Sequence, residues 1–331
     1  MSAPRVTVLM PVHDAAGFIG QALASVLGQS VSDIECLVVD DGSTDGSAVI
    51  AGGTGDPRVR VIRRAHEGMT RALNAGLARA RGEYVARLDA DDWSAPDRLA
   101  QQAAFLDAHA EVVLVGTGIV LVDEAGRRLR DYLYSTGHDA IARELHQGVN
   151  PLPHSSITFR REIVMKAGGY NEVFRISQDY DLYLRLLERE EHRLASIREP
   201  LTYLRWTPNS LSNRGLEQRK EHLLARIAAE ARRTLGVDPT SGNDAGAFLA
   251  MFDAWYWASR EVRYARATQL RRGAVAAFGG GRPLVGFGLM AKAVVLQPSW
   301  VWRRDRWDPA LATEILARWR RTGHGGAGER G

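Results

Sequence analysis

The chain of 331 residues contains a single cysteine, Cys36, and one thiol cannot form an intramolecular disulfide. Cys36 lies in the apolar run Ile34–Val39, so we expect a packed small side chain rather than a nucleophile. Long hydrophobic runs are also missing, because no stretch approaches the roughly 18 apolar residues of a membrane span. The first apolar run, Val6–Met10, is too short for a secretory signal. We therefore expect a cytoplasmic protein.

The sequence also lacks a large excess of charge of one sign and a glycine-rich phosphate loop after its first strand. The 43 Lys and Arg residues against 39 Asp and Glu residues leave a net charge of +4, which suits a phosphate-bearing ligand but indicates no nucleic acid partner. No G-x-G-x-x-G follows the first predicted strand, which disfavours a dinucleotide-dependent oxidoreductase. Hydrophobic residues at 45% and charged residues at 25% are typical of a folded globular protein.

Strand and helix patterns alternate along the first ninety residues. The expected strands are Val6–Met10, ending at Pro11, then Ile34–Val39, Val59–Ile62 and Tyr84–Leu88, and the expected helices are Phe18–Leu27, one from near Ser47, and Met69–Ala80. This alternation predicts a parallel sheet built from βαβ units. Farther on we expect strands at Val112–Val122 and Ser155–Phe159 and helices at Ala140–Gln147 and Asp179–Glu190. From Leu216 the pattern is helical, and Asp253–Ala267 continues it.

Two carboxylate clusters directly follow predicted buried strands, namely Asp40-Asp41 and Asp89-Ala90-Asp91-Asp92. Ligands of open parallel sheets bind at the carboxyl ends of the strands, where the loops converge. Asp89 and Asp91 flank one small residue, and a hard cation such as Mg²⁺ or Mn²⁺ would relieve their repulsion. Turn formation and helix capping, by Asp92 in particular, explain the same residues without a metal. Spacing alone leaves both interpretations open.

Four segments resemble, in family order, the motifs of family 2 glycosyltransferases, which have the GT-A fold. They are Val6–Asp14, Val38–Asp45, Ala72–Ala78 with Gly82–Asp92, and Gln178–Leu186. The resemblance extends over about Val6–Ser212 and implies an α/β GT-A (Rossmann-like) fold, with a mostly parallel sheet flanked by helices and a helical C-terminal extension. We expect a catalytic domain over residues 1–215, a helical region over 216–321 and a disordered tail over 322–331.

The resemblance also implies roles for single residues. The donor and nucleotide site is expected at Pro11, His13, Asp14, Asp41, Arg71, Asn74, Asp89 and Ala90, with Arg81 as a further donor contact. Asp91 would bind the divalent metal, Mn²⁺ or Mg²⁺. Asp179 would be the general base, in preference to Asp181, and His154 and Gln178 would lie on the acceptor side. A solvated Arg71 or Arg81 and a structural His154 are the alternatives.

Two positions depart from the family pattern. Gln178 stands where an acidic residue usually precedes the base. Thr207 stands where a histidine often follows, sometimes as a metal ligand. A hydroxyl replaces imidazole poorly, so we expect Asp91, diphosphate and water to hold the ion.

The sequence thus predicts an inverting, hexosyltransferase-type enzyme that uses a UDP, dTDP or GDP sugar. Its acceptor would be a glycan or a lipid-linked molecule in bacterial surface polysaccharide synthesis. A sugar nucleotidyltransferase and a non-catalytic nucleotide-sugar-binding module are the alternatives. Leu284–Trp307 combines an apolar run with tryptophans and arginines. It would lie in a membrane interface, giving a peripheral protein at the inner face of the cell membrane, or pack on protein, including a homodimer contact.

Overall fold

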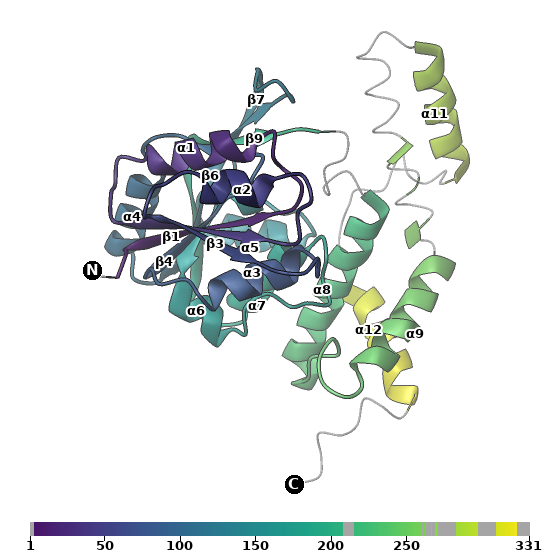
Figure 1. Ribbon diagram of the computed structural model, residues 1–331. Coiled ribbons are helices and arrows are strands. Elements are labelled where there is room, and N and C mark those ends of the chain that lie inside the picture. The colour runs from purple at the N-terminus through teal and green to yellow at the C-terminus, as the bar shows by residue number, and fades with distance from the viewer. Residues whose placement is uncertain are drawn as a thin grey trace. The chain divides into compact units, whose positions relative to one another are not determined.

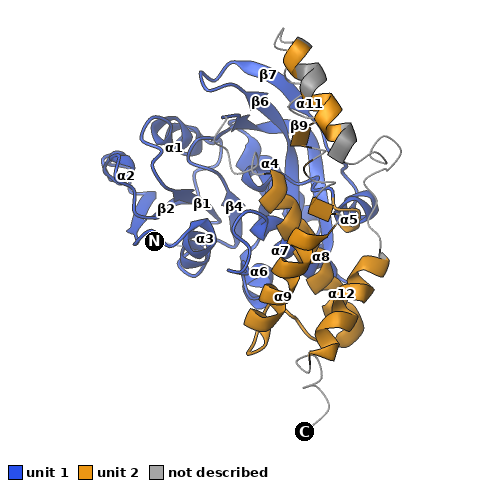
Figure 2. Cartoon of the chain, turned by 90° about the vertical axis from the view of Figure 1, so that its right-hand side faces the viewer, with its two compact units in different colours: residues 1–145, 149–209 blue, residues 146–148, 210–331 orange. Residues whose placement is uncertain are grey.

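A computed structural model describes residues 3–207, 215–259, 261–262, 266, 269–270, 283–296 and 309–322. The chain divides into two compact units, coloured in Figure 2. The first comprises residues 1–145 and 149–209, and the second comprises residues 146–148 and 210–331. All residues expected to form the catalytic site belong to the first unit.

The first unit begins with the predicted alternation. Its elements are β1 (Val6–Val12), α1 (Ile19–Leu27), β2 (Ile34–Asp40), α2 (Ser47–Gly52), β3 (Val59–Arg63), α3 (Met69–Leu77) and β4 (Tyr84–Arg87). β1 pairs in parallel with β2 and β4, and β2 pairs in parallel with β3. The prediction of βαβ units is confirmed for this half of the sheet (Figure 1).

The second half of the sheet is mixed. Its elements are β5 (Trp93–Ser94), α4 (Arg98–Ala108), β6 (Val112–Val122), β7 (Arg128–Tyr132), α5 (His138–His146), η1 (His154–Ser156), β8 (Thr158–Arg160), α6 (Arg161–Lys166), α7 (Gln178–Leu187) and β9 (Arg193–Arg205). Within the described residues, nine strands form one sheet in the order β3-β2-β1-β4-β8-β6-β9-β5, with β7 paired to β6. β6 is parallel to β9, whereas β8 runs antiparallel to both of its neighbours, β4 and β6.

Helices cover both faces of the sheet. The side chains of Val6, Val8 and Met10 on β1 belong to a buried cluster with residues of α1 and α4. Leu9 points to the other face, where α3 packs so closely that a Cβ on Gly76 would lie 2.2 Å from a Leu9 methyl group. Alternate residues of β1 therefore reach opposite cores, which explains why this strand is apolar throughout.

Two local predictions need correction, and one long strand was not predicted. β1 does not end at Pro11 but continues to Val12, because β4 pairs with β1 only as far as Leu9, so that Pro11 needs no N–H toward it. The expected strand Ser155–Phe159 is a 3-10 turn followed by the short strand β8. The thirteen-residue strand β9 was missed, because charged residues and Pro200 interrupt its apolar pattern.

The second unit contains α8 (Gly215–Leu235), α9 (Ala245–Ala258), α11 (Pro283–Leu296) and α12 (Pro309–Arg321). Phe248 on α9 meets Trp319 on α12 edge-on, with ring centroids 5.2 Å apart. Among the described residues, none of the helices has the length and apolarity needed to cross a membrane. The tail from 323 onward and residues 297–308 of the expected interfacial segment lie outside the described residues.

Candidate active site

The carboxyl ends of β1, β2 and β4 meet at one edge of the sheet. Val12 pairs with Asp40, and the Asp41 N–H donates to the Val12 carbonyl at 2.8 Å. The Leu88 N–H donates to the Leu9 carbonyl at 3.2 Å. The loops that begin at His13, Asp41 and Asp89 therefore start beside one another, as the sequence predicted.

Asp41 ties the turn after β2 to the start of α3. Its carboxylate is buried, with 3% of the residue exposed. Oδ1 accepts the Glu67 N–H at 2.9 Å and Oδ2 accepts the Gly68 N–H at 2.8 Å. Gly68 precedes α3 with a φ of +100°, a conformation that glycine adopts readily. Both oxygens of Asp41 thus hold the backbone that shapes this edge.

Two histidines stack beside Asp41. The rings of His13 and His66 lie 4.0 Å apart at 24°, and the Nδ1 atom of each is 3.0 Å from the Asp41 carbonyl oxygen. Because a carbonyl only accepts, Nδ1 of each ring is the donor in these two hydrogen bonds. His66 was missed by sequence reasoning, because a lone histidine in a loop carries no signal.

Asp14 continues the same rim. Its φ is +49°, the one non-glycine residue with positive φ in the described chain. Its Oδ1 accepts the Thr44 N–H at 2.8 Å, and its own N–H donates to Ser43 Oγ at 3.0 Å. Asp14 thereby joins the β1 loop to the β2 loop. Pro11 is buried within β1 opposite Val39, one step behind this rim.

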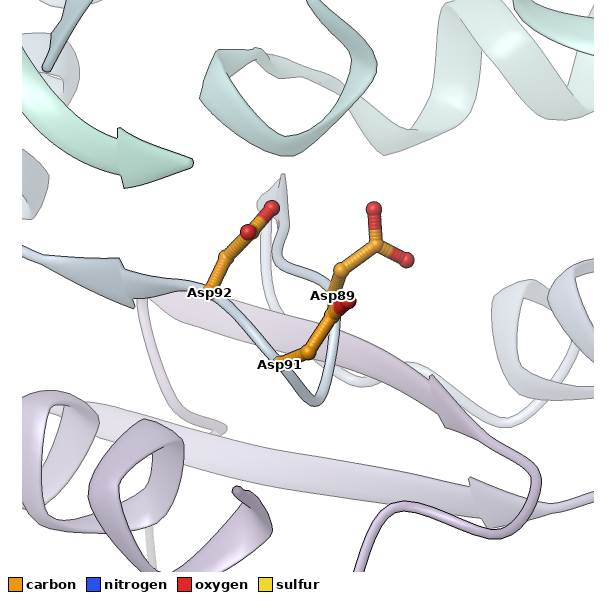
Figure 3. Close-up of side chains that lie close together, drawn as sticks. All are labelled: Asp89, Asp91 and Asp92. Atoms are coloured by element: carbon orange, nitrogen blue, oxygen red, sulfur yellow. The ribbon is translucent and has the colours of Figure 1, made fainter. Parts of the chain in front are cut away.

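The loop after β4 gathers three carboxylates. Oxygens of Asp89, Asp91 and Asp92 all lie within 4.8 Å of one another. Figure 3 shows the three side chains on this loop. Ala90 is buried between them, and the Asp92 N–H closes the turn on the Asp89 carbonyl at 3.2 Å. Carboxylate oxygens at this spacing are ligands that Mn²⁺ or Mg²⁺ accepts.

Burial and mutual repulsion disfavour the ionised forms of Asp91 and Asp92 in this cluster. Burial raises the pKa of Asp91 to about 6, with a further contribution from the charge of Asp89. Burial, followed by the charges of Asp91 and Asp89, raises the pKa of Asp92 well above its ordinary value. Like charges that share a desolvated site disfavour each other's ionisation, and a bound cation would reverse this effect.

Two arginines outside the predicted set hold this loop. Arg87, at the end of β4, places Nη1 2.5 Å from Asp89 Oδ2. Arg205, at the end of β9, donates its N–H to Asp92 Oδ1 at 2.8 Å and its Nε–H to the Asp91 carbonyl at 3.0 Å. Its Nη2 reaches Gln21 on α1 at 2.8 Å. Arg205 was not predicted as part of the site because strand β9, which positions it, was not predicted.

Thr207 follows Arg205 by two residues, and residues 208–214 lie outside the described chain.

Asp179 and Asp181 have separate environments on α7. Asp179 Oδ2 accepts a hydrogen bond of 2.8 Å from Asn150 Nδ2. Burial raises the pKa of Asp179 to about 6, against the opposing effects of the Tyr180 N–H, the Asn150 amide and the charge of Arg87. Asp181 is fully buried and paired with Arg185 at 2.8 Å. This pairing favours Asp179 over Asp181 as the candidate base.

The two acceptor-side residues are inward-facing. Gln178 is 3% exposed, and its Nε2 lies 3.4 Å from Met69 Sδ. His154 Nε2 lies 2.9 Å from the Tyr170 hydroxyl. Desolvation and the nearby Arg87 charge place the pKa of His154 well below its ordinary value. A neutral His154 held by Tyr170 supports the structural alternative for this residue.

The side chains of three predicted donor contacts bind other parts of the protein in this structure. Both polar atoms of the Asn74 side chain bond the backbone of Tyr170, at 2.8 and 2.9 Å. Arg71 pairs with Glu172 at 3.0 Å on the surface. Arg81 binds Glu35 at the amino-terminal edge of the sheet, the edge opposite the carboxylate cluster, so its prediction as a donor contact is wrong.

Comparison of the whole fold with solved structures identifies its class. TarS residues 1–349 of S. aureus, in complex with UDP-GlcNAc, matches with a TM-score of 0.59 and 16% identity over 90% of this chain and 93% of that one. The mannosyltransferase PcManGT from Pyrobaculum calidifontis, in complex with GDP-Man and Mn²⁺, matches with a TM-score of 0.54 and 20% identity over 91% and 88%. The fold is therefore that of the GT-A glycosyltransferases, as predicted.

Sequence comparison identifies the family within the GT-A glycosyltransferases. Residues 7–168 match the profile of Glycosyl transferase family 2. The putative glycosyltransferase EpsE of Bacillus subtilis (strain 168) is 33% identical over 64% of this chain and 77% of its own length. The amylovoran biosynthesis glycosyltransferase AmsE of Erwinia amylovora is 32% identical over 56% and 69%. The match to the O-antigen biosynthesis protein RfbC of Myxococcus xanthus, 33% identical, spans 16% of that longer protein. This chain belongs to glycosyltransferase family 2.

Proposed function

We propose that this family member is an inverting, metal-dependent hexosyltransferase that moves a sugar from a nucleoside diphosphate to a glycan or lipid-linked acceptor. The observation that carries the proposal is the Asp89, Asp91 and Asp92 cluster at the carboxyl edge of the parallel strands. Family membership favours transfer over the nucleotidyltransferase and binding-module alternatives. The proposed base, Asp179, supports it further, because a binding module needs no base.

The proposed donor site lies along the edge from His13 to Asp91. His13, His66 and Asp14 supply exposed polar groups for the base and ribose, while Asp41 holds their loops together. Asp89 and Ala90 stand where the ribose or sugar would pass. We leave Asn74 out of this site, because both its polar atoms are used by Tyr170.

The metal fits the donor set of this loop. Asp89 is already paired with Arg87, and Asp92 already accepts the Arg205 N–H, so we assign the ion chiefly to Asp91. When bound, the ion would neutralise negative charge on the departing diphosphate. Arg87 and Arg205 keep the three carboxylates in place for it. PcManGT, which shares the fold, was solved with Mn²⁺, and this agrees with the choice of metal.

Asp179 has the chemistry of a general base. With a pKa of about 6, its carboxylate is ionised at neutral pH and basic enough to take a proton from an acceptor hydroxyl. As the proton leaves, the acceptor oxygen forms a bond to the anomeric carbon on the face opposite the leaving diphosphate. The bond from that carbon to the diphosphate oxygen breaks, and the configuration inverts.

We place the reaction in the assembly of bacterial surface polysaccharide, following relatives named for amylovoran and O-antigen biosynthesis. A lipid-linked acceptor would bring the enzyme to the inner face of the cell membrane. Helix α11 supports this, because Leu284 and Val285 near its start are 86% and 51% exposed. A surface helix with exposed apolar side chains can lie in a membrane interface.

The deciding experiment is a thermal-shift screen with UDP, GDP, dTDP and CMP, each with and without Mn²⁺. We expect one nucleoside diphosphate to raise the melting temperature only when Mn²⁺ is present, because binding to the native state stabilises it. A response to nucleotide that ignores the metal would contradict the assignment of the carboxylate cluster. The absence of any response would count against the donor site.

A further inference from the structure

Asn150 contacts the proposed base through a hydrogen bond whose direction is fixed. Its Nδ2 donates to Asp179 Oδ2 at 2.8 Å, and its Oδ1 accepts the Leu152 N–H at 3.1 Å. A backbone N–H can only donate and a carboxylate can only accept, so the amide has one consistent orientation. Asn150 lies 29 residues before Asp179 and belongs to none of the motifs seen in the sequence.

A second contact closes the loop of Asn150 against the same helix. The Tyr183 hydroxyl donates to the Leu152 carbonyl at 3.2 Å. Tyr183 stands four residues after Asp179 on α7, so the two side chains share one helix face. Leu152 and Tyr183 are both fully buried. Residues 150–152 are thus attached to α7 both at Asp179 and one turn later.

The segment that carries Asn150 is stiff. Asn150 and Leu152 each precede a proline, Pro151 and Pro153, which restricts both residues to extended backbone. Pro153 itself is extended, with φ −55° and ψ 129°. The amide is therefore presented to Asp179 by backbone that loses little freedom on folding.

The charged and titratable groups that face Asp179 act in opposite directions. The buried Tyr170 and Tyr183 add desolvation, and their own raised pKa values keep both phenols neutral at pH 7. Arg87, on β4, adds positive charge that favours the carboxylate. Asn150 contributes the side-chain hydrogen bond to the same carboxylate. A donor to the ionised form is what a buried base needs if it is to remain a base near pH 7.

We propose that Asn150 is the positioning residue of the general base: its amide engages Oδ2 of Asp179, keeps the carboxylate ionised, and assigns Oδ1 to the acceptor hydroxyl. This inference rests on the proposed function, in which Asp179 takes the acceptor's proton. It adds a residue whose side chain acts on the reaction through Asp179 and otherwise holds the Leu152 N–H of its own loop.

Three variants separate this role from a structural one. Asn150→Ala removes the donor. Asn150→Asp keeps the size and the acceptor for the Leu152 N–H but turns a second carboxylate toward Asp179. Tyr183→Phe is the matched control, because it removes the other attachment of the loop and leaves the Asn150 amide in place.

The first readout is the titration of Asp179, followed by NMR of protein labelled with ¹³Cγ-aspartate and assigned by the signal lost in Asp179→Asn. We expect the midpoint to rise by about one pH unit in Asn150→Ala and further in Asn150→Asp, and to stay near the parent value in Tyr183→Phe. A parent midpoint in both Asn150 variants would overturn the proposal. Asn150→Asp keeps the shape of the site and decides the matter if Asn150→Ala does not fold.

The second readout is donor turnover against pH, to acceptor or to water. We expect kcat to fall about tenfold in Asn150→Ala, with the acidic limb moved upward and Kd for the nucleoside diphosphate unchanged. Loss of diphosphate binding along with turnover would mean a structural role and overturn the proposal. Full turnover in Asp179→Asn would remove the proposed base itself. An inactive Asp179→Asn beside unshifted Asn150 variants would remove only the positioning role.

Discussion

Arg87 Nη1 lies 2.5 Å from Asp89 Oδ2, so the last residue of β4 neutralises the first carboxylate of the loop that follows it. The arginine is 1% exposed, whereas the Asp89 side chain keeps 29% of its surface exposed. The charge of the same guanidinium opposes the burial that raises the pKa of Asp179 on α7, and it adds to the desolvation that lowers the pKa of His154. One buried cation thus links the proposed donor side to the proposed base.

Replacing Arg87 with methionine should destabilise the fold. Asp89, which is partly exposed, would lose its partner, and the loss of a hydrogen bond to a charged group costs about 1.5 to 3 kcal/mol. Urea unfolding would measure the loss. Arg87→Lys is the control, since it keeps the charge and should lose less. Equal midpoints for Arg87→Met and the parent protein would show that Asp89 does not depend on this pair.

Asp179→Asn should reduce sugar transfer by about 10²- to 10⁴-fold, because the amide cannot take the proton. Binding of the nucleoside diphosphate, measured by calorimetry, should stay within about twofold, since Asp179 lies outside the carboxylate cluster. Asp181→Asn is a poor control, because Asp181 pairs with Arg185 in the interior. Turnover that survives in Asp179→Asn would exclude this residue as the base.

The pH dependence of transfer follows from the pKa of Asp179. The proposed base would work only when ionised, and burial raises its pKa to about 6. The rate should therefore be low below pH 6, rise through that value and level off above it. A profile of kcat/KM from about pH 3.5 to 8 checks this. An acidic limb near pH 4 would indicate an exposed, ordinary carboxylate.

Asp91→Ala should abolish the Mn²⁺-dependent stabilisation by nucleoside diphosphate while leaving the melting temperature of the free protein nearly unchanged or slightly raised. The reason is that this carboxylate is costly to keep ionised, as its raised pKa indicates. The measurement is the thermal shift with and without Mn²⁺. If the metal-dependent shift were retained in Asp91→Ala, Asp89 or Asp92 would have to be assigned as the metal ligand instead.

Asp41→Asn should lower the free energy of unfolding by about 1 to 3 kcal/mol, because one amide N–H of Glu67 or Gly68 would face another donor. The matched control is Asp14→Asn, since half-exposed Asp14 leaves its donors open to water. Chemical unfolding of both variants gives the comparison. Equal stabilities would restrict Asp41 to a ligand-binding role.

Leu284→Ser with Val285→Ser should weaken binding to vesicles that contain phosphatidylglycerol by at least tenfold. Each apolar side chain transferred from water to the membrane contributes about 1.5 to 3 kcal/mol. The control is Val49→Ser with Ile50→Ser, two exposed apolar residues of α2 in the catalytic unit. Co-sedimentation measures the difference. Identical binding of both double variants would contradict the interfacial assignment of α11.

The parallel half of the sheet was predictable because its strands are short apolar runs separated by helices, although β3 is only partly buried. Such runs are recognisable in the sequence, and the parallel topology places the loops at their carboxyl ends along one edge of the sheet. Strand β9 was not predictable in the same way. Its exposed Arg198 and Glu199 and its Pro200 interrupt the apolar pattern, and pairing with β6 overrides that local signal.

The carboxylate loop was located from the sequence, whereas the residues that support it were not. Arg205 and Asn150 act through side-chain bonds to residues 114 and 29 positions away, and no local pattern encodes such contacts. Arg81 was misplaced for a related reason. It follows α3, whose two ends lie at opposite edges of the sheet, and helical spacing does not reveal which edge a residue reaches.

The bond from Arg205 to the Asp91 carbonyl spans 114 residues. A ribosome that adds about 5 to 20 residues per second needs roughly 6 to 23 seconds to supply that partner after Asp91 has been made. The parallel strands can form during this time, but the loop of Asp89, Asp91 and Asp92 lacks its contact with Arg205 until that residue has been synthesised. A nascent or truncated chain that ends before residue 205 would therefore have much of the scaffold but lack the Arg205 contacts to the carboxylate loop, so the proposed metal site would be completed late in synthesis.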